Sequence, residues 1–169
     1  MSALTARIAE PDLAGLPDYE VAERLNAPDP ALPLVPVVFS CRAIAQPAVL
    51  SGELELLRIV RRKEQIPVEV SQSGQPVALG TQAMIAIGTL VDAVERDLRV
   101  DPAVPGAADQ VLMMLTAVET MGLLSPATKA AILAHTVRHP SWAEANGMVV
   151  TPEVIFAARG RPRVVQEGA

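Results

Sequence analysis

Fifteen prolines interrupt a chain of 169 residues and limit where its helices can begin and end. Proline fits the first turn of a helix, but it lacks the amide proton that a helix interior needs. Nearly all of these prolines fall at the ends of apolar periodic stretches, so they punctuate helices. Prolines 30, 33 and 36 instead exclude a helix and, with Val37 and Phe39 beside them, predict an extended edge segment at 33–42.

The apolar residues of the chain indicate a helical core. Half of the residues are apolar, yet the chain has two Phe, one Tyr and one Trp, so the core must be aliphatic. A chain of this length fits one domain of ordinary size. We therefore expect a mainly α fold, with a single compact helical domain over 1–160 and a flexible C-terminal tail at 161–169. Short extended segments are expected near 33–42 and at 66–71.

Apolar spacing and capping residues predict the individual helices. The expected helices cover 2–9, 18–26, 46–66, 78–100, 106–121, 125–137, 140–148 and 151–160. Gly122 is expected to follow the 106–121 helix as its C′ residue, and Ser125 with Pro126 to cap the next helix. The apolar stripe of the 46–66 helix consists of Leu50, Leu54, Leu57 and Val60. The stripe of the 78–100 helix consists of Met84, Ile87, Val91, Val94 and Leu98. The short strand expected at 66–71 is a candidate to pair with the strand near Val37.

Charge and cysteine content narrow the function classes. The formal net charge is −5, so the chain as a whole does not favour the phosphates of nucleic acid. Cys41 is the single cysteine, which excludes an internal disulfide and a thiolate metal cage, and its expected strand makes it a buried, inert thiol. No run of 18 apolar residues occurs, so we expect no membrane span and predict folding in a reducing cytoplasm.

The candidate catalytic and metal-binding residues form no complete set. His135 and His139 are spaced i, i+4, as in some zinc sites, but a third ligand and a general base are missing from the pattern. We favour a hydrated helix end for both. Nucleotide-binding glycine loops and hydrolase nucleophile motifs do not occur in the sequence. We predict a non-enzymatic protein with no cofactor, metal or small-molecule substrate.

Two segments resemble nucleic-acid-binding elements. The hairpin at 107–137 has the glycine turn of a helix-turn-helix, but its second helix offers Thr128, Lys129 and alanines where base-reading side chains would stand. An ordinary helical hairpin is therefore the favoured interpretation.

The C-terminal segment "RGRPR" resembles the core of an AT-hook, which lays arginines into a narrow minor groove. Its arginines are Arg159, Arg161 and Arg163. The acidic surroundings oppose that role, and Arg159 followed by Gly160 equally fits a helix C-terminus. We favour the helix end and keep DNA binding as the alternative.

The stretches "LPDYEVAERLNAP", "SWAEANGM" and "VTPEVIFAARG" resemble a family of small virion-associated proteins of tailed bacteriophages. The resemblance implies a structural component of a phage particle, in the tail, baseplate or head–tail region, made in the host cytoplasm. Its partners would be other virion proteins and copies of itself. A capsid decoration protein is the alternative within this class, and a small DNA-binding regulator is the alternative from another class.

The contact residues we expect lie on the extended segment and on a late short helix. Val35, Val37 and Phe39 are positioned to add a strand to a neighbour's sheet. Trp142 is either a core residue or an interface anchor. A helix pair also carries methionines, which are either adaptable contact residues or ordinary core fillers. These methionines are Met84, Met113, Met114 and Met121.

Overall fold

The computed structural model describes residues 2–160, of which 53% are helical, and every strand within them is two residues long. The mainly α fold expected from the sequence is confirmed. Within the range 1–160, for which the sequence predicts one domain, the described residues group into two compact units. Unit 1 comprises residues 2–35 and 139–160, and unit 2 comprises residues 36–138. The predicted tail at 161–169 lies outside the described residues.

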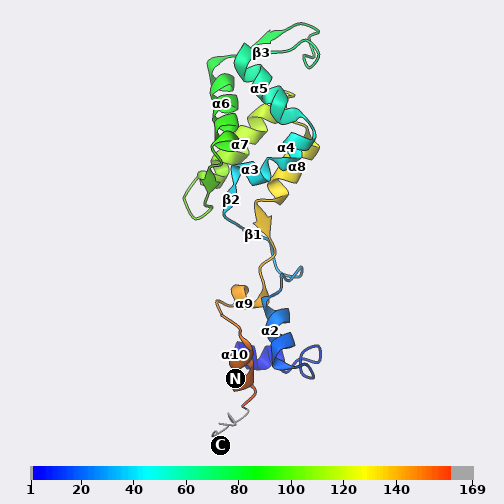
Figure 1. Cartoon of the computed structure of the whole chain (residues 1–169), viewed down its shortest axis with the longest axis vertical. Helices are drawn as coiled ribbons and strands as arrows, with labels where there is room; N and C mark the ends of the chain where they lie inside the picture. Colours follow the sequence, from blue (N-terminus) through cyan, green and yellow to red (C-terminus); the bar gives the residue numbers. More distant parts are fainter. Residues whose placement is uncertain (1, 161–169) are drawn as a thin grey trace, which may run out of the picture. The chain divides into compact units, whose positions relative to one another are not determined.

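Unit 1 is assembled from the two ends of the described chain (Figure 1). Its helices are α1 (Ala3–Ile8), α2 (Asp18–Asn26), α9 (Trp142–Ala145) and α10 (Pro152–Ala158). Side chains of Ser2, Ser141 and Thr151 cap three of them by accepting backbone N–H groups. Helix α2 packs against α9 and α10, and α10 also contacts α1. The core between them is aliphatic and includes Leu13, Val21, Leu25, Val150 and Ile155.

Polar contacts join the distant segments of unit 1. Arg159, at the end of α10, forms an ion pair with Asp18, at the start of α2, and donates a second hydrogen bond to the Leu13 carbonyl at 3.2 Å. The two charged side chains are only 12% and 17% exposed. At the other end of α2, the side-chain amide of Asn26 donates a hydrogen bond to the Val150 carbonyl at 2.7 Å. These bonds supplement the apolar packing at positions where buried polar groups need partners.

Unit 2 is a helical body (Figure 1). Its helices are α3 (Cys41–Ile44), α4 (Gln46–Leu50), α5 (Glu53–Lys63), α6 (Thr81–Glu95), α7 (Ala107–Thr120) and α8 (Pro126–Ala134). The longest helix, α6, contacts α3, α5 and α7, and α4 packs against α5 and α8. The residues at the centre, each at most 1% exposed, include Leu57, Val60, Ile87, Val91 and Val118.

The two longest helices predicted from the sequence, 46–66 and 78–100, are both shorter than expected. The 46–66 helix is divided into α4 and α5 at Gly52, which has φ +78°, a conformation that favours glycine. Leu50 therefore leaves the predicted stripe and is 82% exposed. The 78–100 helix ends at Glu95, because the backbone turns at Asp97 (φ +52°), and Leu98 is 50% exposed.

The helical hairpin α7–α8 follows its sequence signals. Gly122 adopts φ +73° just after α7, and the Ser125 side chain accepts the Thr128 N–H at the start of α8. Pro126 stands in the first turn, where its missing amide proton costs nothing. The predicted turn and cap are confirmed.

The strands pair differently from the prediction. Strand β1 (Val35–Pro36) pairs with β6 (Val137–Arg138), and β2 (Phe39–Ser40) pairs antiparallel with β5 (Arg99–Val100). Strand β3 (Gln65–Ile66) pairs with β4 (Val77–Ala78), so the predicted pairing of the 66–71 segment with the strand near Val37 is wrong. The extended stretch stops at Ile66 because a turn begins at Pro67. The Pro67 carbonyl accepts hydrogen bonds from the Val70 and Ser71 N–H groups.

Cys41 belongs to a helix, which corrects its predicted place in a strand. It is the first residue of α3, whose N-cap Ser40 accepts the Ala43 N–H. The thiol is buried in the core of unit 2, as expected. Burial, together with the carboxylate of Asp97, raises the pKa of Cys41, so the thiol is protonated at neutral pH.

Glu53 links two helices of unit 2 through its carboxylate. It stands at the start of α5 and accepts the Ser125 N–H, at the start of α8, at 2.9 Å, and the Ser51 hydroxyl at 2.9 Å. Burial is the largest single influence and raises the pKa of Glu53, but hydrogen bonds from Thr128, Ser125 and Ser51 together outweigh it. The pKa of Glu53 is therefore lowered, because these donors favour the charged form.

We predict that Glu53→Gln lowers the free energy of unfolding at pH 7 and that this difference shrinks in acid. A carboxylate with a lowered folded-state pKa stabilises the protein fully above its unfolded pKa of about 4.3, and this contribution is lost as the pH falls through the folded value. Urea unfolding from pH 7 to pH 3 measures both effects. Glu69→Gln, in the turn after β3, is the control. A difference that does not change with pH contradicts the assignment.

We predict opposite outcomes for glycine at Glu64 and Asp97, the two non-glycine residues with positive φ among residues 2–160. Glu64 (φ +54°) ends α5, and Glu64→Gly removes a steric cost of about 1–2 kcal/mol while adding about 0.5–1 kcal/mol of backbone entropy. Its net effect is a gain of about 0.5–1 kcal/mol in the free energy of unfolding. Asp97→Gly destabilises instead, because the Asp97 carboxylate accepts the Ser40 hydroxyl and the Arg42 N–H. Thermal unfolding of both variants checks the contrast.

Candidate functional site

Helices α6 and α7 enclose an open, uncharged groove on unit 2. Its volume is about 510 Å³. One wall comes from α6 and the other from α7 and the residue that follows it. The lining residues are Gln82, Ala83, Ala86, Met113, Met114, Ala117, Thr120 and Met121. None of these side chains is ionisable, although 20% of the residues in the chain are charged.

The groove follows from the side chains that the two helices turn away from the core. Helix α6 buries Ile87 and Val91, and α7 buries Leu115 and Val118, so the groove residues occupy other faces of the same helices. Alanines leave the space between the helices hollow. Met113, on the α7 wall, is 65% exposed, whereas Met114 and Met121 are partly buried and also pack against the core of unit 2.

The exposure of Met113 makes the groove a candidate interaction surface. An exposed thioether chain gains free energy when another surface covers it, by about 25 cal/mol for each Å² of apolar area removed from water. Methionine side chains are unbranched and adapt to the shape of what covers them. A neutral, apolar groove with a flexible wall is suited to an apolar protein surface and lacks the charges that bind phosphate or metal.

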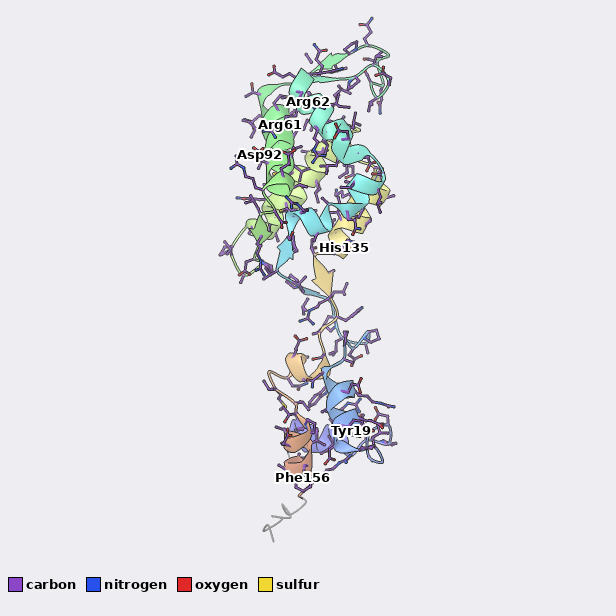
Figure 2. The ribbon with its side chains drawn as sticks, in the orientation of Figure 1. Tyr19, Arg61, Arg62, Asp92, His135 and Phe156 are labelled. Atoms are coloured by element: carbon purple, nitrogen blue, oxygen red, sulfur yellow. The ribbon has the colours of Figure 1, made fainter. Side chains whose placement is uncertain are left out.

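The arginines of α5 line a second hollow, of about 340 Å³, beside α6. Arg61 lies 2.7 Å from Asp92, and these two side chains are labelled in Figure 2. Arg58 pairs with Glu95 at 3.1 Å, and Arg62 with a further carboxylate, Glu55, at 3.2 Å. Each lining arginine therefore already has an acidic partner. The cluster joins α5 to α6 and has no excess positive charge for an anionic ligand.

The interior of unit 2 contains a small cavity. Its volume is about 40 Å³, and aliphatic residues line it together with Cys41 and Met114. A space of this size with apolar walls has no hydrogen-bonding partners for water and is too small for a cofactor. Because the Cys41 thiol is protonated at neutral pH, this cavity does not provide a nucleophile.

The contact residues predicted on the extended segment differ in how deeply they are buried. Val35 and Val37 are half-buried, and the Val37 N–H donates to the Thr136 carbonyl at 3.0 Å. Phe39 is 7% exposed in the core of unit 2 and is paired with Val100, so it presents no surface to a partner. The segment is thus largely paired within the chain, because β5 and the residues around β6 satisfy its backbone groups.

Trp142 and the two histidines do not line the groove. Trp142 is half-buried and packs against the core of unit 1, which agrees with its interpretation as a core residue. Helix α8 ends at Ala134, so His135 and His139 do not share one helix face as the zinc hypothesis required. The His139 ring nitrogen Nδ1 lies 2.8 Å from the Leu32 carbonyl. Residues 2–160 contain no group of three side chains placed to hold a metal ion.

The nucleic-acid candidates are engaged inside the chain where they are described. Arg159 is paired with Asp18 and mostly buried, so it is a helix-end cation of unit 1. In the hairpin, the Lys129 ammonium donates to Glu119 at 2.6 Å and to Thr116 at 3.0 Å. Arg161 and Arg163 lie outside the described residues.

No protein-family model, curated protein or solved structure matches the chain. Among the helices of residues 2–160, none has the length and apolar character that crossing a membrane requires.

The methionines of the groove are noticeable in the sequence, but the alanines that make it hollow are not. The sequence favours core filling for Met113, Met114 and Met121, with adaptable contact as the alternative; Met114 and Met121 do pack against the core of unit 2, whereas Met113 is exposed. The signal for the groove was the spacing of Ala83 and Ala86 on the α6 face next to α7. Alanine has a high helix propensity, so this spacing alone does not indicate a surface.

We predict that Arg159→Ala lowers the free energy of unfolding by about 2 kcal/mol, because it leaves the mostly buried Asp18 carboxylate without its cation. Arg24→Ala, which removes an exposed arginine of the same unit, should cost less than about 0.5 kcal/mol. Thermal unfolding of both variants measures the difference. Unchanged stability of Arg159→Ala, combined with loss of salt-dependent binding to duplex DNA, would restore the DNA-binding alternative.

Proposed function

We propose that the protein is a non-enzymatic structural component of a tailed-phage particle, in the tail, baseplate or head–tail region, and that it acts through protein–protein contacts. The observation that carries the proposal is the uncharged α6–α7 groove with the exposed Met113 on its wall. The resemblance of the "LPDYEVAERLNAP" and "VTPEVIFAARG" segments to small virion-associated proteins supports the setting.

The chemistry of the groove favours a protein partner over other ligand classes. Its walls offer hydrocarbon, thioether, hydroxyl and amide groups but no charge, so a phosphate backbone or a metal ion gains nothing there. Its open form also differs from the enclosed pockets that bury most of a small ligand. An apolar face of another protein would cover the methionines and displace water from them.

The two alternative functions, a capsid decoration protein and a DNA-binding regulator, require different features of the chain. A capsid decoration protein would use the same kind of contact and would differ in copy number. A DNA-binding regulator needs cations available to phosphates. Arg159 and Lys129 are instead paired with carboxylates of the same chain, so we do not propose this function.

We predict that the chain is present in purified particles of the phage that encodes it, at about a dozen copies or fewer, as the symmetry of a tail or neck requires. Quantitative mass spectrometry against the capsid and portal proteins gives the count. Met113→Glu should reduce incorporation at least about tenfold, because it places a charge in the groove.

Leu112→Glu is the matched control, since Leu112 is an exposed neighbour on α7 that does not line the groove. It should be incorporated like the unaltered chain. Hundreds of copies would instead identify a shell decoration protein. Absence from the particle would reject the structural function altogether.

A further inference from the structure

We propose that the interior cavity of unit 2 is a binding site for a small apolar molecule, such as a dissolved gas, and that Met114 is the side chain past which this molecule enters. The cavity has a volume of about 40 Å³, and its lining shares only Met114 with the lining of the α6–α7 groove. This inference does not depend on the proposed function, because it concerns the interior of unit 2 and not a surface that another protein covers.

Small side chains leave the cavity open where the helices of unit 2 converge. Each of the helices α3 to α8 contributes at least one residue to its lining. Ala45, Ala48 and Ala93 line the cavity at positions that are only 4–7% exposed. An alanine side chain ends at its Cβ atom, so it does not reach into this space. Neighbours such as Leu57 and Leu115 therefore lack contact partners on the side that faces the cavity.

The chemistry of the lining favours an apolar ligand. Apart from the sulfur groups of Cys41 and Met114, the side chains that line the cavity are hydrocarbon. Water finds no good hydrogen-bonding partner in such a space, and apolar cavities of this kind stay dry and accept apolar ligands. The sulfur atoms are polarizable and add dispersion attraction to that of the aliphatic walls. An apolar molecule gains these contacts and gives up no hydrogen bonds with water.

The volume of the cavity limits the ligand to a very small molecule. An engineered apolar cavity of about 150 Å³ accepts benzene or xenon. The cavity of unit 2, at about 40 Å³, is roughly a quarter of that size. It therefore has room for roughly one or two heavy atoms, which corresponds to a dissolved gas and excludes a ring or an acyl chain.

Met114 separates the cavity from the groove. Among the residues that line the cavity, Leu90 and Met114 are partly exposed and the others are buried. Met114 also lines the groove, whereas Leu90 does not. The methionine side chain is unbranched and flexible, so its rotation opens a path between the two spaces without displacing a helix. The rate at which a ligand enters and leaves therefore depends on this side chain.

Xenon is the probe that tests the site. Methyl NMR spectra of the full chain, recorded under increasing xenon pressure, should show saturable shifts for Leu57 and Leu115, which line the cavity. Leu25, in the core of unit 1, should not shift. Shifts that rise without saturation, or that are equal in the two cores, would show only nonspecific contact with the gas and would overturn the proposal.

Filling the cavity gives a matched comparison along one helix. Ala93→Val adds two methyl groups on the α6 side of the cavity and should abolish the xenon shifts of Leu57, and Ala48→Val should do the same from α4. Ala83→Val makes the same change on α6 but in the outer groove, so it should leave the shifts unchanged. Thermal unfolding identifies the variants that keep the fold. A folded Ala93→Val or Ala48→Val variant with unchanged shifts would overturn the cavity as the site, and loss of the shifts in Ala83→Val would place xenon in the groove.

The exchange rate of hyperpolarised xenon between the protein and solvent tests the entry route. Met114→Ile replaces a flexible side chain with a β-branched one that is stiff at χ1, and it should slow the exchange at least about threefold. Leu90→Ile introduces the same side chain at the other partly exposed position and should leave the rate unchanged. An exchange rate that Met114→Ile does not lower, or that both variants lower equally, would overturn Met114 as the point of entry.

Discussion

The packing of α2 against α10 is the contact on which unit 1 depends, because its two segments are separated in sequence by the whole of unit 2. Apolar residues such as Val21 and Ile155 supply most of the buried surface. The Arg159–Asp18 pair then satisfies the two charged groups that lie at the edge of this packing. A charged pair of this kind costs desolvation energy, so it adds geometric specificity more than stability. It also removes Arg159 from the set of cations that could meet DNA.

Unit 2 depends on contacts that are closer in sequence. Its glycines and capping residues set the helix ends, and its core places α6 between α5 and α7. Glu53 adds a longer link, since its carboxylate joins the start of α5 to the start of α8. The same helices that bury Ile87 and Val118 must turn other faces outward. The groove therefore forms from the faces of α6 and α7 that do not contribute to the core. Its uncharged lining distinguishes it from the hollow lined by the paired arginines of α5.

These features connect the fold to the proposed function. A structural component must hold a stable shape and present a surface that another protein covers. The aliphatic cores supply the shape, and in the proposed function the exposed Met113 of the groove is the side chain that a partner would cover. The segments that carry the proposed resemblance belong to unit 1 and the groove belongs to unit 2, so the two parts of the proposal rest on different residues.

The sequence by itself determined the mainly α fold and most helix ends, because capping and turn residues act within a few positions of the chain. Ser125, Pro126 and Gly122 are examples whose predicted roles are confirmed. The tertiary structure decided the strand pairing, the burial of Phe39, the pairing of Arg159 and the groove. Each of these joins residues far apart in sequence, and a single chain's local pattern carries no information on which distant partner lowers the free energy most.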